Sequence, residues 1–202
     1  DGEKEVNATI TINIKDKDGR LTGTSKNKIV LAGKADFSTK KQITVKNPLL
    51  WSVESPSLYN AEIIIDVNNK VTDIYNQPFG IRSIELSAEK GFLLNGKSVE
   101  LKGGCMHHDN GLLGSAAFDR AEVRRVEIMK ANGYNAIRCA HNPPSEVFLN
   151  ACDRLGILVI DEFTDMWENY KNPQDYSRFF REWWNIDLTA MILRDRNHPG
   201  II

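Results

Sequence analysis

The chain has 202 residues, enough for one large domain or two small ones. Hydrophobic residues make up 41% of it and charged residues 26%, which excludes a disordered tail and a collagen-like rod. The 26 Lys and Arg residues nearly balance the 27 Asp and Glu residues, so nucleic acids and anionic membranes are poor candidates for partners. No apolar run approaches the roughly 18 residues of a membrane span. A neutral substrate or a protein surface fits this balance better.

Cysteine usage argues against disulfides and metal centres. Cys105, Cys139 and Cys152 are an odd number and contain no Cys-x-x-Cys pair. His107 and His108 follow Cys105 closely, but no second pair of ligands stands at a suitable spacing. We therefore expect free, mostly buried thiols and no bound metal. The compartment stays open, because an export signal can be removed from the mature chain.

Residues 6–86 alternate between apolar and polar side chains, as strands with one buried face do. The first strand is predicted to begin at Val6, and four more are predicted in the stretches Lys28–Leu31, Gln42–Val45, Tyr59–Val67 and Val71–Tyr75. Asn68 and Asn69 are predicted to join the last two strands as a hairpin turn. Because every histidine and cysteine lies after residue 104, we expect this half to be an antiparallel sandwich or barrel with a scaffolding or recognition role.

After about residue 86, short apolar strands alternate with helices, as in right-handed β-α-β units. Strands are predicted in four stretches: Val99–Gly104, Asn135–Cys139, Ile157–Ile160 and, just beginning, His198–Ile202. Helices are predicted between them: from Asp119 to near Gly133, from just after Pro143-Pro144 to Gly156, and roughly from Arg178 to Leu193. Asp119 and Glu122 are predicted to cap the first helix as a pair.

Polar residues follow each of the three complete strands. The clusters are His107-His108-Asp109, Arg138 with His141-Asn142, and Asp161-Glu162 with Asp165. The carboxyl ends of parallel strands share one mouth, where β/α barrels place their active sites, so the pattern predicts a site there. The alternative is that loop ends are polar simply because buried loops leave backbone groups unpaired. Asp161 and Glu162 are adjacent and point to opposite faces, so they cannot form a facing carboxylate pair.

Aromatic residues after the third strand allow two interpretations. Trp167 lies in a polar loop with Tyr170, where its ring can either stack on a sugar or plug the rim of the barrel against the first domain. Trp183 and Trp184 lie on a helix rich in apolar residues and are expected to fill a core.

The segments Asn135–Pro143 and Asp153–Ile160 closely resemble the signature of glycoside hydrolase family 2, which comprises β-galactosidases, β-glucuronidases and β-mannosidases. Ordered matches extend across nearly the whole chain: Asn47-Pro48-x-Leu50-Trp51, Pro56-x-Leu58-Tyr59, Phe79–Arg82, Gly91–Lys97, Lys102-Gly103, Asp161-Glu162 and Arg194–Pro199.

The resemblance implies an immunoglobulin-like β-sandwich in residues 1–86, short of its first strands, and then the first β/α units of an incomplete (β/α)8 TIM barrel in residues 87–202. It also implies retaining hydrolysis of β-glycosides by two carboxylates about 5 Å apart, both placed beyond Ile202. We therefore expect an internal fragment of a β-galactosidase-like enzyme. Alone, it should be inactive and prone to self-association at its open barrel edge.

The same resemblance assigns substrate contacts by position. Arg138 matches an arginine beside the nucleophile, and His108 and His141 match histidines that hydrogen-bond the sugar. The expected substrate-binding set is His108, Arg138, His141, Asn142, Asp161, Glu162 and Trp167. Asn142 stands where the signature usually has tyrosine, and Trp167 stands where the best-known β-galactosidases place a histidine that helps bind magnesium, so no cofactor is expected. The alternative is a non-catalytic carbohydrate-binding or interaction module that kept the sandwich and part of the barrel.

Overall fold

The computed structural model describes residues 4–202, which fold as two compact units. Of the described residues, the first unit contains 4–49 and Ser57–Ile81, and the second contains Leu50–Pro56 and Arg82–Ile202. The division after Ile81 lies shortly before the boundary expected at residue 86. The short segment Leu50–Pro56 leaves the sheet unit and packs within the second unit.

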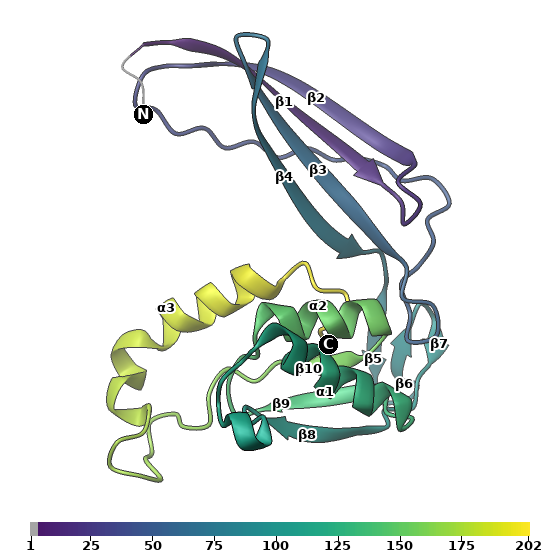
Figure 1. Ribbon diagram of the computed structural model, residues 1–202, viewed down its shortest axis with the longest axis vertical. Coiled ribbons are helices and arrows are strands. Elements are labelled where there is room, and N and C mark those ends of the chain that lie inside the picture. The colour runs from purple at the N-terminus through teal and green to yellow at the C-terminus, as the bar shows by residue number, and fades with distance from the viewer. Residues whose placement is uncertain (1–3) are drawn as a thin grey trace. The chain divides into compact units, whose positions relative to one another are not determined.

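The first unit is a four-stranded antiparallel sheet in the order β2-β1-β3-β4 (Figure 1). Its strands are β1 (Val6–Lys15), β2 (Leu21–Leu31), β3 (Leu58–Val67) and β4 (Lys70–Gly80). Asn68 and Asn69 have φ angles of 51° and 64°, the left-handed values that a two-residue hairpin turn requires, so the predicted hairpin is confirmed. Among the described residues, the unit supplies this one sheet of the sandwich.

The strand predicted at Gln42–Val45 is wrong. This segment pairs with no strand, although Ile43 and Val45 are half-buried and their neighbours are exposed. Ile43 packs over Gly23 of β2, where a Cβ atom would lie only 2.7 Å from an Ile43 methyl group. The alternation therefore reflects an extended segment that turns every second side chain towards the sheet, and not a strand within it.

The second unit contains a small antiparallel sheet and a parallel β/α unit. The small sheet has the order β5-β6-β7, with β5 (Ile84–Ser87), β6 (Gly91–Leu94) and β7 (Lys97–Ser98). The parallel sheet has the order β10-β9-β8, with β8 (Gly103–His107), β9 (Ala136–Ala140) and β10 (Leu158–Ile160). Its helices are the short 3-10 helix η1 (Gly111–Leu113), α1 (Asp119–Ala131), α2 (Glu146–Leu155) and α3 (Ser177–Asp195). A parallel bridge between Val159 and Ile201 starts the fourth strand, as predicted.

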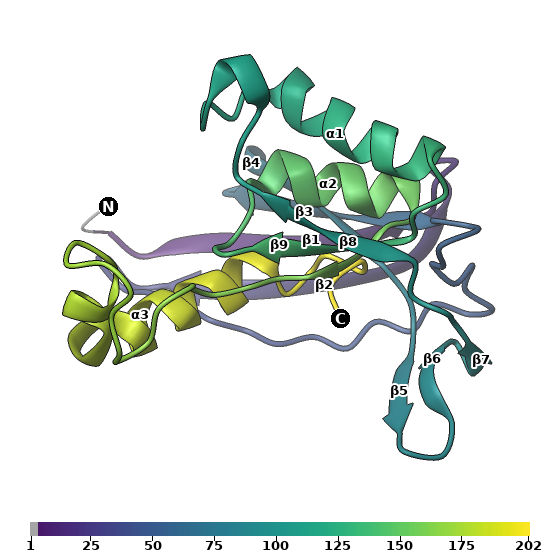
Figure 2. The same cartoon turned by 90° about the horizontal axis from the view of Figure 1, so that it is seen from below.

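Helices α1 and α2 pack side by side over one face of the parallel sheet (Figure 2). The buried core between them is formed by Val126, Ile137, Cys139, Phe148, Leu149, Ala151, Cys152, Ile157 and Val159. On the other face Cys105, Arg138 and Ile160 stand opposite one another in register, and all three are exposed. The sheet therefore has one packed face and one open face that carries an arginine and a thiol.

Two predicted boundaries in this unit need correction. The first parallel strand begins at Gly103 and not at Val99, because the Asn135 side chain donates to Glu100 O (2.8 Å) and accepts from Lys102 N (2.7 Å) in place of a strand neighbour. Helix α1 begins after Phe118 without a side-chain cap, so Asp119 and Glu122 do not form the predicted capping pair. Glu122 is buried instead.

Polar contacts hold the segment Leu50–Pro56 within the second unit, which is called the barrel unit from here on. Trp51 is fully buried, and its indole N–H donates to Asp153 O at 2.8 Å. Lys130 Nζ donates to Val53 O and to Gly156 O, at 3.0 Å each. Gly156 ends α2, as predicted. It adopts the left-handed conformation, and a Cβ atom there would lie 2.3 Å from Val53 O. The sequence signature around Trp51 is therefore part of the barrel unit.

Candidate active site

Arg138 lies at the centre of the open face, on β9. Its Nη2 atom is 2.9 Å from Glu162 Oε1 and 2.7 Å from Oε2, and its Nη1 atom is 3.6 Å from Cys105 Sγ. The hydrogen bond to Glu162, followed by the contact with Cys105, raises the pKa of Arg138. A guanidinium group held by a carboxylate in this way is a fixed positive charge at the carboxyl end of the sheet.

His141 joins the same cluster from the loop after β9. Its Nδ1 atom is 3.6 Å from Glu162 Oε1 and 3.5 Å from Asp165 Oδ1. A hydrogen bond from Lys171, 2.8 Å away, lowers the pKa of Asp165. The ends of two neighbouring strands therefore bring Arg138, His141 and Glu162 together, as the strand-end pattern predicts.

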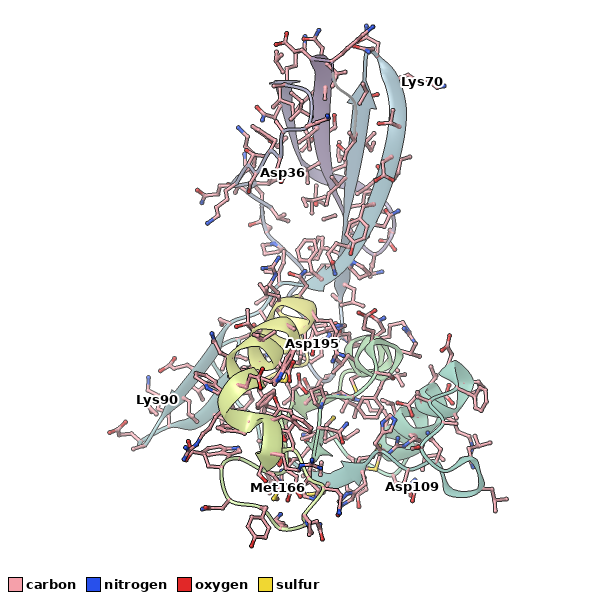
Figure 3. All side chains as sticks on the ribbon, turned by 90° about the vertical axis from the view of Figure 1, so that its left-hand side faces the viewer. Asp36, Lys70, Lys90, Asp109, Met166 and Asp195 are labelled. Carbon is pink, nitrogen blue, oxygen red and sulfur yellow. The ribbon has the colours of Figure 1, made fainter. Side chains whose placement is uncertain are left out.

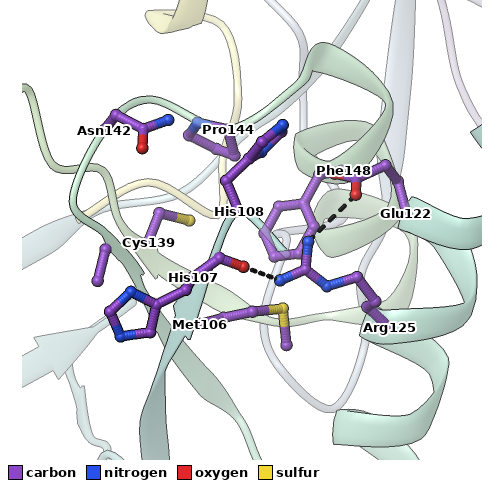
Figure 4. Close-up of a pocket in the computed structure, with 10 residues that line it drawn as sticks. Met106, His107, His108, Glu122, Arg125, Cys139, Asn142, Pro144 and Phe148 are labelled. Atoms are coloured by element: carbon purple, nitrogen blue, oxygen red, sulfur yellow. Dashed lines mark hydrogen bonds and ion pairs between the residues drawn. The ribbon is translucent and has the colours of Figure 1, made fainter. Parts of the chain in front are cut away.

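The rings of His107 and His108 point to opposite sides at the end of β8 (Figure 4). The His107 ring lies edge-on to the His141 ring, with 4.9 Å between centroids. His107, His108 and Asn142 all line a small pocket beside α1 and α2, and the Asn142 amide donates to Pro143 O at 3.1 Å, but of the three only His107 has a ring contact with His141. The structure thus brings His107, and not His108 or Asn142, to the cluster around Arg138.

Trp167 lies in the loop after β10 and is 69% exposed. Its ring is stacked on Phe180 of α3, and Phe180 is stacked on Trp184, with 6.4 Å between centroids in both pairs. The rings of Trp167, Phe180 and Trp184 line a cavity of about 510 Å³ together with Arg138 and Glu162. Trp183 and Trp184 are both 42% exposed, so the expectation that they fill a core is wrong for the described part of the chain.

Asp161 is oriented differently from its neighbour Glu162, as the alternation predicts. It lies against Asp195, which is 3% exposed at the end of α3 distant from Met166 (Figure 3). Burial, and then the hydrogen bond and charge of Asp195, raise the pKa of Asp161 to about 7. Asp195 also accepts two hydrogen bonds from Arg194, at 2.6 and 2.7 Å. Asp161 therefore joins a charge network with Asp195 and Arg194, while it also lines the cavity that contains Arg138 and Glu162.

This network predicts that the folded chain loses stability as the pH rises. A protonated Asp161 is favoured in the folded state up to about pH 7, whereas the unfolded carboxyl ionises near 3.8, so deprotonation favours unfolding across that interval. Burial alone would lower the pKa of His198, but the hydrogen bond with Asp153 at 2.6 Å raises it, so its stabilisation is also lost with rising pH. Urea midpoints are expected to fall between about pH 4 and pH 7, where only the folded state keeps the Asp161 proton, and to fall further above about pH 6.5 as His198 loses its proton.

Asp161→Asn should flatten this pH dependence and raise the urea midpoint at the alkaline end. Glu89→Gln is the matched control, because Glu89 is an exposed carboxylate in the same unit and its replacement should leave the slope unchanged. A midpoint that still falls equally in the Asp161→Asn variant would show that another group is responsible.

Three members of the site were not in the expected substrate-binding set. Cys105 is the register partner of Arg138, and His107 lies on the same face of β8, so the spacing of two residues between them was the signal. Asp165 was noted only as part of a strand-end cluster. All three cysteines are free, and two are buried while Cys105 is exposed. Within residues 4–202, no three His, Cys, Asp or Glu side chains are grouped closely enough to hold a metal ion.

Comparison with known proteins identifies the family. Residues 1–82 match the family described as glycosyl hydrolases family 2, and residues 84–202 match its TIM barrel domain. The chain belongs to glycosyl hydrolase family 2. The expected architecture of a family 2 sandwich domain followed by the start of its TIM barrel is therefore confirmed.

No helix among the described residues is long and apolar enough to cross a membrane.

Relatives resemble the chain along almost its whole length. It is 44% identical over 196 residues to the β-galactosidase BoGH2A of Bacteroides ovatus, covering 96% of the chain and 23% of that protein. It is 44% identical over 161 residues to a putative β-glucuronidase of Formosa agariphila, covering 79% of the chain and 16% of that protein. A crystal structure of a family 2 member from Bacteroides cellulosilyticus superposes with a TM-score of 0.93 at 46% identity, covering 99% of the chain and 26% of that structure. The chain thus spans about a quarter or less of each of these relatives.

Proposed function

We propose that the chain is part of a longer retaining β-glycosidase that acts as a β-galactosidase. The observation that carries the proposal is the convergence of Arg138, Glu162 and His141 at the carboxyl ends of two parallel strands. In this proposal the two reacting carboxylates come from outside residues 1–202. The part described here then binds and orients the sugar.

The chemistry of the cluster suits that task. The charge of Arg138 keeps a nearby carboxylate ionised and ready to attack, while Glu162 fixes the plane of the guanidinium group. His107 and His141 lie edge to face and present ring nitrogens that can hydrogen-bond sugar hydroxyls. The ring of Trp167, stacked on Phe180, offers its other face to an apolar side of a sugar.

The proposal is tested with the full-length protein and three substrates: the 4-nitrophenyl β-galactoside, β-glucuronide and β-mannoside. We expect kcat/KM to be highest for the galactoside, and the first-formed sugar to be the β-anomer by NMR. A glucuronide preference would keep the glycosidase and reject the galactosidase. The absence of turnover on all three would favour a carbohydrate-binding module, and calorimetry with galactose would then test it.

The isolated chain is expected to self-associate and to be inactive. Helix α3 exposes a group of large apolar side chains that need covering: Phe179, Trp183, Ile186, Ile192 and Leu193. Sedimentation velocity should therefore give a coefficient that rises with protein concentration. A sharp monomer boundary that does not depend on concentration would contradict this expectation.

A further inference from the structure

Glu122 is a buried carboxylate that no substrate contact explains. It lies on α1 and is 1% exposed. Its side chain accepts hydrogen bonds from Asn110 Nδ2 at 3.0 Å, from Ser145 Oγ at 3.0 Å and from Arg125 Nη1 at 3.1 Å. Burial would raise the pKa of Glu122, but these three hydrogen bonds outweigh it and lower the pKa. The group is therefore a buried anion that is satisfied by three donors.

The donors come from separate parts of the chain. Asn110 lies in the loop that follows β8, and Ser145 lies in the loop that follows β9 and caps α2 by accepting from Phe148 N at 3.1 Å. The Glu122 carboxylate thus connects the loop after β8 with the loop after β9. His107 is the last residue of β8, directly before the first loop, and His141 is the first residue of the second loop.

Arg125 extends this connection to the backbone of the site. Its Nη2 atom donates to His107 O while its Nη1 atom donates to Glu122, and Figure 4 shows the guanidinium group between the two. Its guanidinium carbon lies 5.9 Å from the centre of the Phe148 ring. Arg125 of α1 thereby holds the carbonyl of His107, while the ring of the same residue contacts His141.

We propose that Glu122 and Arg125 are positioning residues, which set the relative placement of His107 and His141 at the sugar site. The inference rests on the proposed function, because it takes the two histidines as sugar contacts. Glu122 and Arg125 line the small pocket beside α1 and α2 together with His107, but this pocket holds only about 10 Å³, too little for a sugar, so the two residues act through the loops. Loss of this alignment should lower the rate even though no contact with the sugar is removed.

The test uses Glu122→Gln in the full-length protein, assayed with 4-nitrophenyl β-galactoside. Glutamine keeps the shape but has one acceptor oxygen and brings an N–H₂ group against donors, so the three hydrogen bonds cannot all form. We expect kcat/KM to fall at least about tenfold. Arg125→Lys should give a similar loss, because lysine cannot bind both Glu122 and His107 O in one plane. Glu127→Gln is the matched control, since Glu127 lies on the same helix and pairs with exposed Arg120.

A double-mutant cycle separates positioning from general destabilisation. If Glu122 acts through the histidines, Glu122→Gln should change kcat/KM by no more than about twofold in a His107→Ala, His141→Ala background. Equal losses in both backgrounds, or an unchanged kcat/KM for Glu122→Gln alone, would overturn the inference while the proposed function stands. An unchanged kcat/KM for the His107→Ala, His141→Ala protein itself would reject the site assignment, and the inference with it.

Discussion

Trp51→Ala is expected to destabilise the barrel unit by about 3–5 kcal/mol, the cost of removing a large buried aromatic side chain. Trp51 is fully buried, its indole N–H donates to Asp153 O, and its own carbonyl accepts from Asn95 Nδ2 at 2.9 Å. The same Asp153 contacts His198 and Gly200 N through its carboxylate. A cavity at Trp51 would therefore weaken the packing of α2 and the start of the fourth strand together.

Urea unfolding of the chain at low protein concentration, followed by circular dichroism, measures this effect. Trp51→Phe should cost less, about 1–3 kcal/mol, because a ring remains and the main loss is a partner for Asp153 O. Trp183→Ala is the control, since Trp183 is 42% exposed and should change stability by no more than about 0.5 kcal/mol. Equal shifts for Trp51→Ala and Trp183→Ala would contradict a buried anchoring role for Trp51.

The change from a period of two to alternating strands and helices predicted an antiparallel sheet followed by β/α units, and the family resemblance then implied a sandwich and a TIM barrel. Apolar patterns report which side chains are covered, and this is why the hairpin at Asn68-Asn69 and the end of α2 at Gly156 were predictable. The same patterns do not report which part of the chain covers those side chains. Gln42–Val45 alternates because it lies on a sheet, and Val99–Lys102 has its backbone groups satisfied by a side chain, Asn135.

The candidate site was predictable in its place but not in all its members. Neighbouring parallel strands end at the same edge of the sheet, and this brings Arg138, Glu162 and His141 together. The choice between adjacent histidines depends on where the strand begins, because a shift of one residue reverses the face on which a side chain lies. His107 shares a face with Cys105, and His108 does not. Glu122 was assigned to a helix cap because its buried partners, Asn110 and Ser145, are distant in sequence.

Arg138→Ala is expected to lower kcat/KM of the full-length protein on 4-nitrophenyl β-galactoside at least about tenfold, or more than about 1.4 kcal/mol of transition-state stabilisation. The variant removes the positive charge and leaves Glu162 without the donor that is 2.9 Å away. Arg138→Lys should recover little, because an ammonium group cannot reproduce the two contacts with Glu162 and the one with Cys105. Arg181→Ala is the control, since Arg181 is exposed on α3 and pairs with Glu168.

The two adjacent histidines give a second, internal comparison for the same assay. His107→Ala and His141→Ala are expected to lower kcat/KM by a similar factor of at least about ten, because their rings lie edge to face within the cluster. His108→Ala should have a smaller effect, because its ring points to the side opposite to that of the His107 ring (Figure 4). The reverse order, with His108→Ala the more damaging variant, would place the sugar on the other side of β8. Unchanged kcat/KM values for Arg138→Ala, His107→Ala and His141→Ala would show that the active site does not lie on the open face of the sheet.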